Sequence, residues 1–161
     1  MEQYIEAFAS VCTTVFKAML NYDLEAGAPF YINRDKVKAW DVSALIRLSG
    51  EARGLVALSM KTDLAIAIAG KLTKKRHRFL DEEVIDAVGE MANIIAGNVT
   101  QKLENLFNLN ISLPRILTGI GHEILWADTR LRIISVPFKL PDNHELCLLA
   151  SLSPAPPGGG G

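Results

Sequence analysis

Three polar residues within one mostly apolar segment have the types and spacing to act together on a phosphoryl group. They are Asp86, Glu90 and Asn93, separated along the chain by three and then two residues. Successive residues of a helix are rotated by roughly 100°, so these three side chains fall within about 60° of one another. Gly97 lies on the same face, where the lack of a side chain would let another surface approach closely.

A carboxylate one helical turn from an amide is suited to phosphoryl chemistry because the two groups differ in charge. The amide of Asn93 offers a donor and an acceptor and does not titrate, so it can hold a water molecule in line with a phosphorus atom. A carboxylate is repelled by a phosphoryl group, and Glu90 is better suited to binding a lysine of a partner. Phosphoryl transfer depends mainly on positioning and charge stabilisation, so these groups suffice if the partner supplies a metal ion.

The same pattern also has a simpler interpretation as an ordinary solvated helix face, which carries polar residues at this spacing in most proteins. Gly89 and Gly97 favour the functional interpretation. Each glycine costs about 1 kcal/mol relative to alanine inside a helix, and that cost calls for a packing or functional reason.

The elements that must position these residues follow from the apolar periodicity. We expect helices over residues 2–22, 62–72 and 81–106, a β-hairpin over 40–60, and further strands over 111–117, 123–140 and 145–152. This order predicts an α+β fold, an antiparallel β-sheet packed by long helices, in two loosely similar halves. Residues 1–153 are expected to form a single domain, and the Pro- and Gly-rich tail 154–161 is expected to be disordered.

The segment around Asn93 resembles the phosphatase motif of the CheC, CheX and FliY family. That motif is an Asp or Ser, three residues, a Glu, two residues and an Asn, often followed by Ala-Gly. Asp86, Glu90 and Asn93 occupy its positions here, and Ala96 and Gly97 follow. The flanking residues 80–104, the run 113–119 and the strands that end near residue 152 resemble CheX in particular, so the resemblance covers residues 2–153.

The resemblance implies a role for each residue of the motif. CheX-like proteins dephosphorylate phosphorylated CheY-type response regulators. Asn93 would orient the attacking water, Glu90 would bind the invariant lysine of the regulator's active site, and Asp86 and Gly97 would support the site. The chain itself would bind no cofactor, and the Mg²⁺ ion would be held by the response regulator.

The resemblance also bears on the first helix and on the oligomeric state. CheC-like members carry a second copy of the motif in the first helix. Here that helix has Glu6, but Ala9 occupies the position three residues later where the motif has Asn. That half is therefore expected to be inactive. CheX proteins are homodimers joined through strands into a continuous sheet, so we expect a homodimer, and the β-rich run 123–140 would offer the edge.

Composition sets limits on the other classes of function. The 161 residues carry a formal net charge of −1, which gives no general attraction to nucleic acid. The basic run 74–78 lacks aromatic interleaving and is interpreted as a solvated linker, with steering of an acidic partner as a secondary hypothesis. Cys12 and Cys147 lie in apolar surroundings, and the three histidines have no ligand spacing, so no metal site is expected.

These observations predict a cytoplasmic protein with no membrane segment that acts as an aspartyl-phosphate phosphatase on a CheY-type regulator. A non-catalytic module that binds a receiver domain through the same helix face is the alternative. A structural component similar to flagellar switch proteins is the third possibility, and the presence of both Glu90 and Asn93 makes it the weakest.

Overall fold

The computed structural model describes residues 3–32, 38–122 and 132–156. The described residues contain three α-helices, α1 (Tyr4–Leu20), α2 (Thr62–Thr73) and α3 (Glu82–Lys102). The strands are β1 (Glu25–Ala26), β2 (Phe30–Tyr31), β3 (Trp40–Gly50), β4 (Ala52–Met60), β5 (Leu109–Ile111), β6 (Arg115–His122), β7 (Ile134–Lys139) and β8 (Glu145–Pro154).

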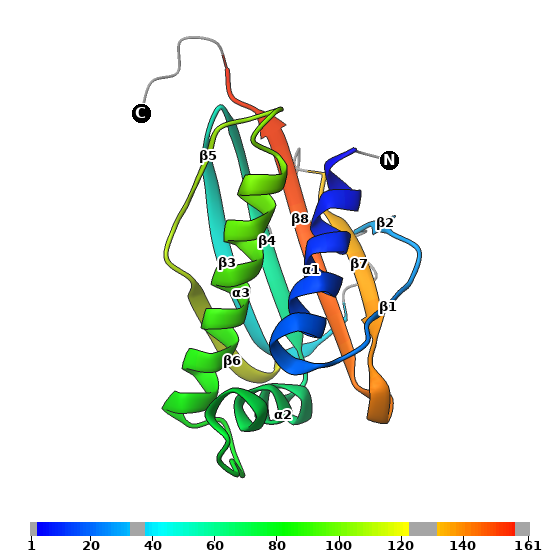
Figure 1. Ribbon diagram of the computed structural model, residues 1–161, viewed down its shortest axis with the longest axis vertical. Coiled ribbons are helices and arrows are strands. Elements are labelled where there is room, and N and C mark those ends of the chain that lie inside the picture. The colour runs from blue at the N-terminus through cyan, green and yellow to red at the C-terminus, as the bar shows by residue number, and fades with distance from the viewer. Residues whose placement is uncertain (1–2, 33–37, 123–131, 157–161) are drawn as a thin grey trace.

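The helices pack on one face of an antiparallel sheet (Figure 1). The strand order is β1-β7-β8-β4-β3-β5, with β2 also pairing with β7 and β6 with β3. All of these pairs are antiparallel. The predicted α+β fold is therefore confirmed.

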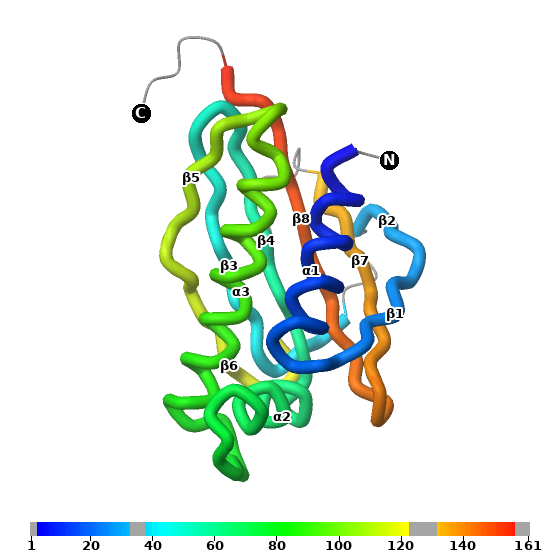
Figure 2. The backbone as a smooth tube through the Cα atoms, viewed as in Figure 1, coloured from blue at the N-terminus to red at the C-terminus, as the bar shows by residue number. Residues whose placement is uncertain are grey.

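The two predicted halves are visible in the connectivity of the sheet. The hairpins β3–β4 and β7–β8 meet at β4 and β8, which pair from Ala52 opposite Pro154 to Met60 opposite Leu146. Helix α1 precedes the first hairpin and α3 precedes the second, and the two helices lie side by side over the sheet (Figure 2). Each half also sends short strands to the other, because β1 and β2 pair with β7 whereas β5 and β6 pair with β3.

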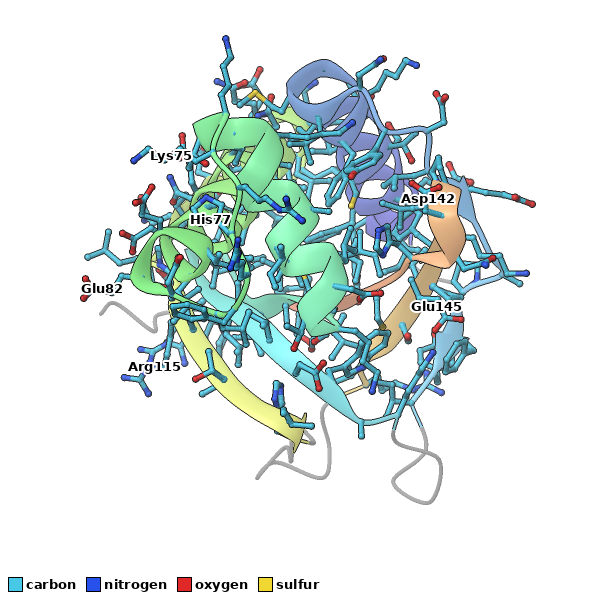
Figure 3. The ribbon with its side chains drawn as sticks, turned by 90° about the horizontal axis from the view of Figure 1, so that it is seen from below. Lys75, His77, Glu82, Arg115, Asp142 and Glu145 are labelled. Carbon is cyan, nitrogen blue, oxygen red and sulfur yellow. The ribbon has the colours of Figure 1, made fainter. Side chains whose placement is uncertain are left out.

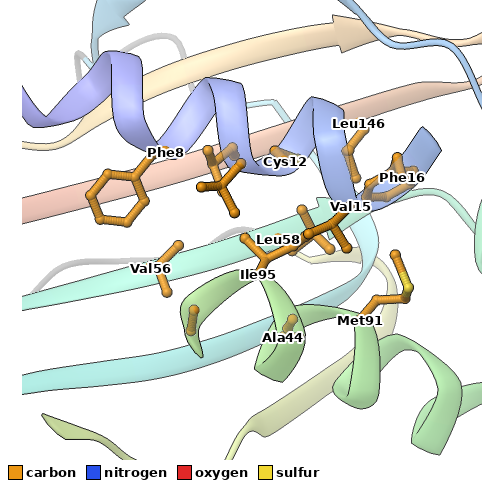
Figure 4. Close-up of a cluster of buried hydrophobic side chains, with 14 of the residues drawn as sticks. Phe8, Cys12, Val15, Phe16, Ala44, Val56, Leu58, Met91, Ile95 and Leu146 are labelled. Atoms are coloured by element: carbon orange, nitrogen blue, oxygen red, sulfur yellow. The ribbon is translucent and has the colours of Figure 1, made fainter. Parts of the chain in front are cut away.

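The main core lies between the helices and the sheet. One cluster contains Phe8 and Phe16 of α1, Met91 and Ile95 of α3 and Leu58 of β4, and all five residues are at most 2% exposed (Figure 4). Burial of each large apolar side chain stabilises the fold by about 1.5–3 kcal/mol. The core therefore fixes α3 along its whole length relative to the sheet.

Several element boundaries differ from the sequence-based prediction. Helix α3 ends at Lys102 rather than near residue 106, because the amides of Leu106 and Phe107 both donate to the Leu103 carbonyl in a tight turn. Strand β8 extends past the predicted domain boundary to Pro154, and the amide of Ala155 donates to the Glu51 carbonyl. Residues 157–161 of the predicted tail lie outside the described residues.

The predicted free edge over residues 123–140 needs correction. Within that run, β7 pairs with β8 on one side and with β1 and β2 on the other, so its backbone groups are used inside the sheet. Residues 123–131 lie outside the described residues. Among the described strands, β6 pairs only with β3 and forms an edge of the sheet.

Candidate functional site

Helix α3 begins at a well-defined N-cap. The Asp81 carboxylate accepts a hydrogen bond from the Val84 amide at 2.8 Å, and Glu82 and Glu83 follow in the first turn. Acidic groups are favourable there because the helix dipole places partial positive charge at the N-terminus. The Val84 amide, and next the His77 side chain, lower the pKa of Asp81.

One side of α3 is buried against the sheet and α1, as the periodicity predicts. The large apolar residues of this side are all at most 1% exposed, namely Val84, Val88, Met91, Ile95 and Val99. With this side fixed, the opposite side must face solvent.

The three residues of the predicted site lie together on that solvent side. Asp86, Glu90 and Asn93 are all exposed, and Gly97 is partly exposed. None of the three side chains makes a hydrogen bond or ion pair with another described residue. Asn98, which is also exposed on α3, instead donates its amide to the Ile94 carbonyl at 2.8 Å. The carboxylate of Glu90 and the amide of Asn93 are therefore available to a partner.

The two glycines of α3, Gly89 and Gly97, lie in different surroundings. A Cβ atom at Gly89 would lie 3.3 Å from Cδ1 of Ile116 and 3.6 Å from Cγ of Pro114, so Gly89 lets α3 pack closely against the segment that leads into β6. A Cβ atom at Gly97 would meet no heavy atom within 4 Å. Packing among the described residues therefore does not require glycine at position 97, and the space beside it is open.

Two neighbours hold the sides of α3 and leave the outward face open. On one side, Lys102 donates to the hydroxyl of Ser10 on α1. On the other side, Pro114 and Ile116 lie against Gly89. Sequence reasoning missed these flanking contacts, because they join segments that periodicity within one helix does not relate.

A shallow depression of about 340 Å³ lies at the C-terminal end of α3. Its walls come from the last turn of the helix and the start of β5, namely Thr100, Gln101, Glu104, Phe107, Asn108, Leu109 and Asn110. Glu104 is seven residues after Gly97 and would share the outward face of a longer helix, but it lies in the turn beyond Lys102. The depression contains none of the predicted site residues.

Other candidate reactive groups lie away from α3's outward face or are buried. Among the described residues, no group of three or more His, Cys, Asp and Glu side chains is arranged to hold a metal ion. Both cysteines are free and buried, and burial raises the pKa of each thiol above its ordinary value. A thiol with a raised pKa is a poor nucleophile at neutral pH. Among the described helices, none combines the length and the apolar character that crossing a bilayer requires.

Comparisons with known proteins agree with the motif. The family model named chemotaxis phosphatase CheX matches residues 42–139, a range that contains all of α3. The CheY-P phosphatase CheX of Thermotoga maritima is 24% identical over 134 residues, which are 82% of this chain and 81% of that protein.

Solved structures show the same architecture. The chemotaxis protein CheX of Vibrio vulnificus is 27% identical, with a TM-score of 0.85, over 94% of this chain and 100% of that one. A chain in the CheX-CheY-BeF3-Mg²⁺ complex from Borrelia burgdorferi is 27% identical, with a TM-score of 0.77, over 93% of this chain and 97% of that one.

Proposed function

Because this chain belongs to the chemotaxis phosphatase CheX family, we propose that it hydrolyses the aspartyl phosphate of a CheY-type response regulator. One observation carries the proposal. Glu90 and Asn93 stand exposed and unpartnered among the described residues, one turn apart on a helix whose opposite side is fixed in the core. The fixed helix holds the two residues at a constant spacing, so their side chains can enter the phosphorylated site of another protein without a rearrangement of the fold.

The proposed reaction is an in-line displacement at phosphorus. The amide of Asn93 positions a water molecule, the water oxygen bonds to phosphorus, and the bond between phosphorus and the aspartyl oxygen breaks. The aspartate returns as a carboxylate, and both protons of the water leave with inorganic phosphate as dihydrogen phosphate. Asn93 does not titrate, so it contributes orientation rather than base strength.

Glu90 has a separate part in this proposal. Its carboxylate binds a lysine of the regulator's active site, and that contact places Asn93 opposite the phosphoryl group. Mg²⁺ belongs to the regulator in this scheme, and the related complex from Borrelia burgdorferi contains CheY with BeF3 and Mg²⁺. Asp86 supports the same face one turn earlier, and Gly97 provides clearance one turn later.

The homodimer remains a prediction. Strand β6 lies at an edge of the described sheet, so a second copy has backbone groups with which to pair. The outward face of α3 lies on the helix layer and β6 lies in the sheet, so strand pairing between copies would not use the Glu90 and Asn93 side chains.

Phosphate release from a panel of phosphorylated receiver domains tests the proposal. The wild-type protein should accelerate release from at least one of them. Asn93→Ala should lower kcat by about 10²-fold or more, because the water loses its positioning group. Its affinity for the same receiver loaded with BeF3 and Mg²⁺ should stay within about threefold of wild type.

Asn98→Ala is the matched control, since it removes an exposed amide of the same helix that bonds to its own backbone. It should retain wild-type activity. If the wild-type protein binds a loaded receiver but accelerates release from none, the chain is a non-catalytic receiver-binding module and the proposed enzymatic function is wrong.

A further inference from the structure

The loop between α2 and α3 presents a concentrated positive surface that the phosphatase motif does not use. Lys74, Lys75, Arg76 and Arg78 are all exposed, and the adjoining Phe79 is 67% exposed. We call residues 74–79 the basic loop. Figure 3 looks onto this end of the molecule, where Lys75 and the loop lie beside Glu82 at the start of α3.

The basic loop is held in place by a buried histidine. The His77 side chain is only 4% exposed, and its ring bonds Thr73 Oγ1 of α2 at 2.7 Å and the Asp81 carboxylate at 3.1 Å. Both helices are therefore tied to the loop. A loop fixed in this way loses little further conformational freedom when it contacts a partner.

One ion pair shows which side of α3 the loop occupies. The Nζ atom of Lys75 lies 3.4 Å from the Oε2 atom of Glu83. Glu83 and Glu90 are seven residues apart, which is close to two helical turns, so they project from the same side of α3. The basic loop therefore lies on the Glu90 side of the helix.

The remaining cations are free to meet a partner. No carboxylate among the described residues forms an ion pair with Lys74, Arg76 or Arg78. Lys74 also caps α2 with a φ of 56°, a left-handed conformation that glycine adopts at lower cost. The left-handed backbone conformation of Lys74 destabilises the fold by about 1 kcal/mol relative to an unstrained residue.

The loop is close enough to share one interface with the motif. Glu90 lies roughly 14 Å along the helix axis from Asp81, at 1.5 Å per residue. A standard protein interface covers about 800 Å² on each partner, which is a patch roughly 16 Å in radius. A receiver domain centred on Glu90 would therefore reach the basic loop at its rim.

We propose that the basic loop is a second contact surface for the phosphorylated receiver domain, and that it meets acidic groups beside the aspartyl phosphate. This inference rests on the proposed function. A site that holds Mg²⁺ and an aspartyl phosphate must present carboxylate and phosphate oxygens, so its surroundings are anionic. The α3 face also carries Glu82, Glu83 and Asp86, which would repel such a site, and the four cations of the loop outnumber those three carboxylates.

A protein is a better occupant of this surface than a nucleic acid. Arg and Phe are enriched where proteins meet, and Phe79 exposes its ring next to Arg78. The chain as a whole carries a net charge of −1, which works against binding an extended polyanion.

Charge at the rim of an interface affects association and its salt dependence more than the chemical step. The double variant Arg76→Gln/Arg78→Gln should therefore lower kcat/KM about three- to tenfold at low ionic strength and leave kcat at saturating receiver unchanged. Its kcat/KM should also fall less steeply than that of wild type as salt is raised, since fewer exposed charges are left to screen.

The matched control is Arg53→Gln/Lys139→Gln, which removes two exposed cations from β4 and β7. This control should keep the wild-type kcat/KM and salt dependence. Binding of each variant to a receiver loaded with BeF3 and Mg²⁺ gives the same comparison without turnover.

The outcomes separate the two proposals. If the wild-type protein is active and the double variant has the same kcat/KM and the same salt dependence, the proposed role of the loop is wrong. The proposed phosphatase activity then still stands. A wild-type protein that neither dephosphorylates nor binds any receiver overturns both. If the double variant loses affinity for a DNA duplex while its affinity for the receiver is unchanged, the loop is a nucleic-acid-binding surface and the proposal is wrong.

Discussion

Helices α1 and α3 occupy corresponding places in the two halves of the molecule, yet they present different outward faces. Each carries an exposed glutamate, Glu6 in α1 and Glu90 in α3. Three residues later, α3 has the exposed Asn93, whereas α1 has Ala9, which is partly buried and packs against the core. At the equivalent position, the scaffold therefore carries an exposed amide in α3 and a methyl group in α1.

The difference continues one turn further along each helix. Seven residues after the glutamate, α3 has Gly97 with open space above it, and α1 has Thr13. The Thr13 hydroxyl donates to the Ala9 carbonyl at 3.0 Å, so it is used within α1. Under the proposed function, the position of a helix in this fold does not by itself make a site, and the residue types at these two positions decide whether a receiver domain can be engaged.

The largest contrast between the two helices is expected at their glutamates. Glu90→Gln should lower kcat/KM by about 10- to 10²-fold, because a charge-assisted contact to the partner's lysine becomes a neutral one. Glu6→Gln, on the related helix, should stay within about twofold of wild type. Both are checked by steady-state phosphate release, and equal losses in the two variants would break the comparison.

A smaller effect is expected where the two helices differ in bulk. Gly97→Thr places the α1 residue on α3 and should lower kcat/KM about tenfold, because the added side chain obstructs the approach of a receiver. It should also raise the free energy of unfolding by a few tenths of a kcal/mol, since glycine is the poorer helix former and nothing lies within 4 Å. Phosphate release and urea denaturation measure the two quantities on one sample.

Thr13→Gly is the reciprocal control. It should reduce stability by a similar few tenths of a kcal/mol and leave phosphate release unchanged. A loss of activity in Thr13→Gly equal to that in Gly97→Thr would show that both helices contribute to docking.

The smallest effect concerns the starts of the two helices. Asp81→Ala should lower the free energy of unfolding at pH 7, because α3 loses its side-chain cap. Gln3 caps α1 without a side-chain hydrogen bond, so Gln3→Ala should have no measurable effect. Chemical denaturation measures both differences.

The pH dependence of the Asp81 effect has a defined sign. The pKa of Asp81 is lower in the folded protein than its ordinary value of 3.8, so the unfolded chain binds the proton more readily. The stabilisation is present above that ordinary value and is lost as the pH falls through the lowered pKa. The gap between wild type and Asp81→Ala should therefore narrow in acid, and a gap that widened would contradict the role of the charge.

The outward face of α3 was predictable because it depends on local periodicity alone. The buried positions of the helix are large and apolar, so the places of Asp86, Glu90 and Asn93 follow from the geometry of one element. The same reasoning failed at the end of the helix, where no Gly or Pro marks the turn that follows Lys102.

Features that depend on distant segments could not be predicted. The two-residue strands β1 and β2 have no periodicity of their own and are defined only by pairing with β7. The structural role of Gly89 could not be predicted either, because Pro114 and Ile116, which lie against it, are outside the helix. His77 was interpreted as one of several scattered histidines, but burial between two helices makes it the support of the basic loop.

The seam between β4 and β8 has a consequence for how the protein is made. Its partners are the segments 52–60 and 146–154, so the central pairing of the sheet joins residues that are 86 to 102 positions apart. Such distant contacts slow folding, because closing the long loop between the two strands costs entropy before their pairing contributes any favourable free energy. During synthesis the first hairpin must wait with β4 unpaired on that side until the final strand emerges, and only then does the surface that supports α3 become complete.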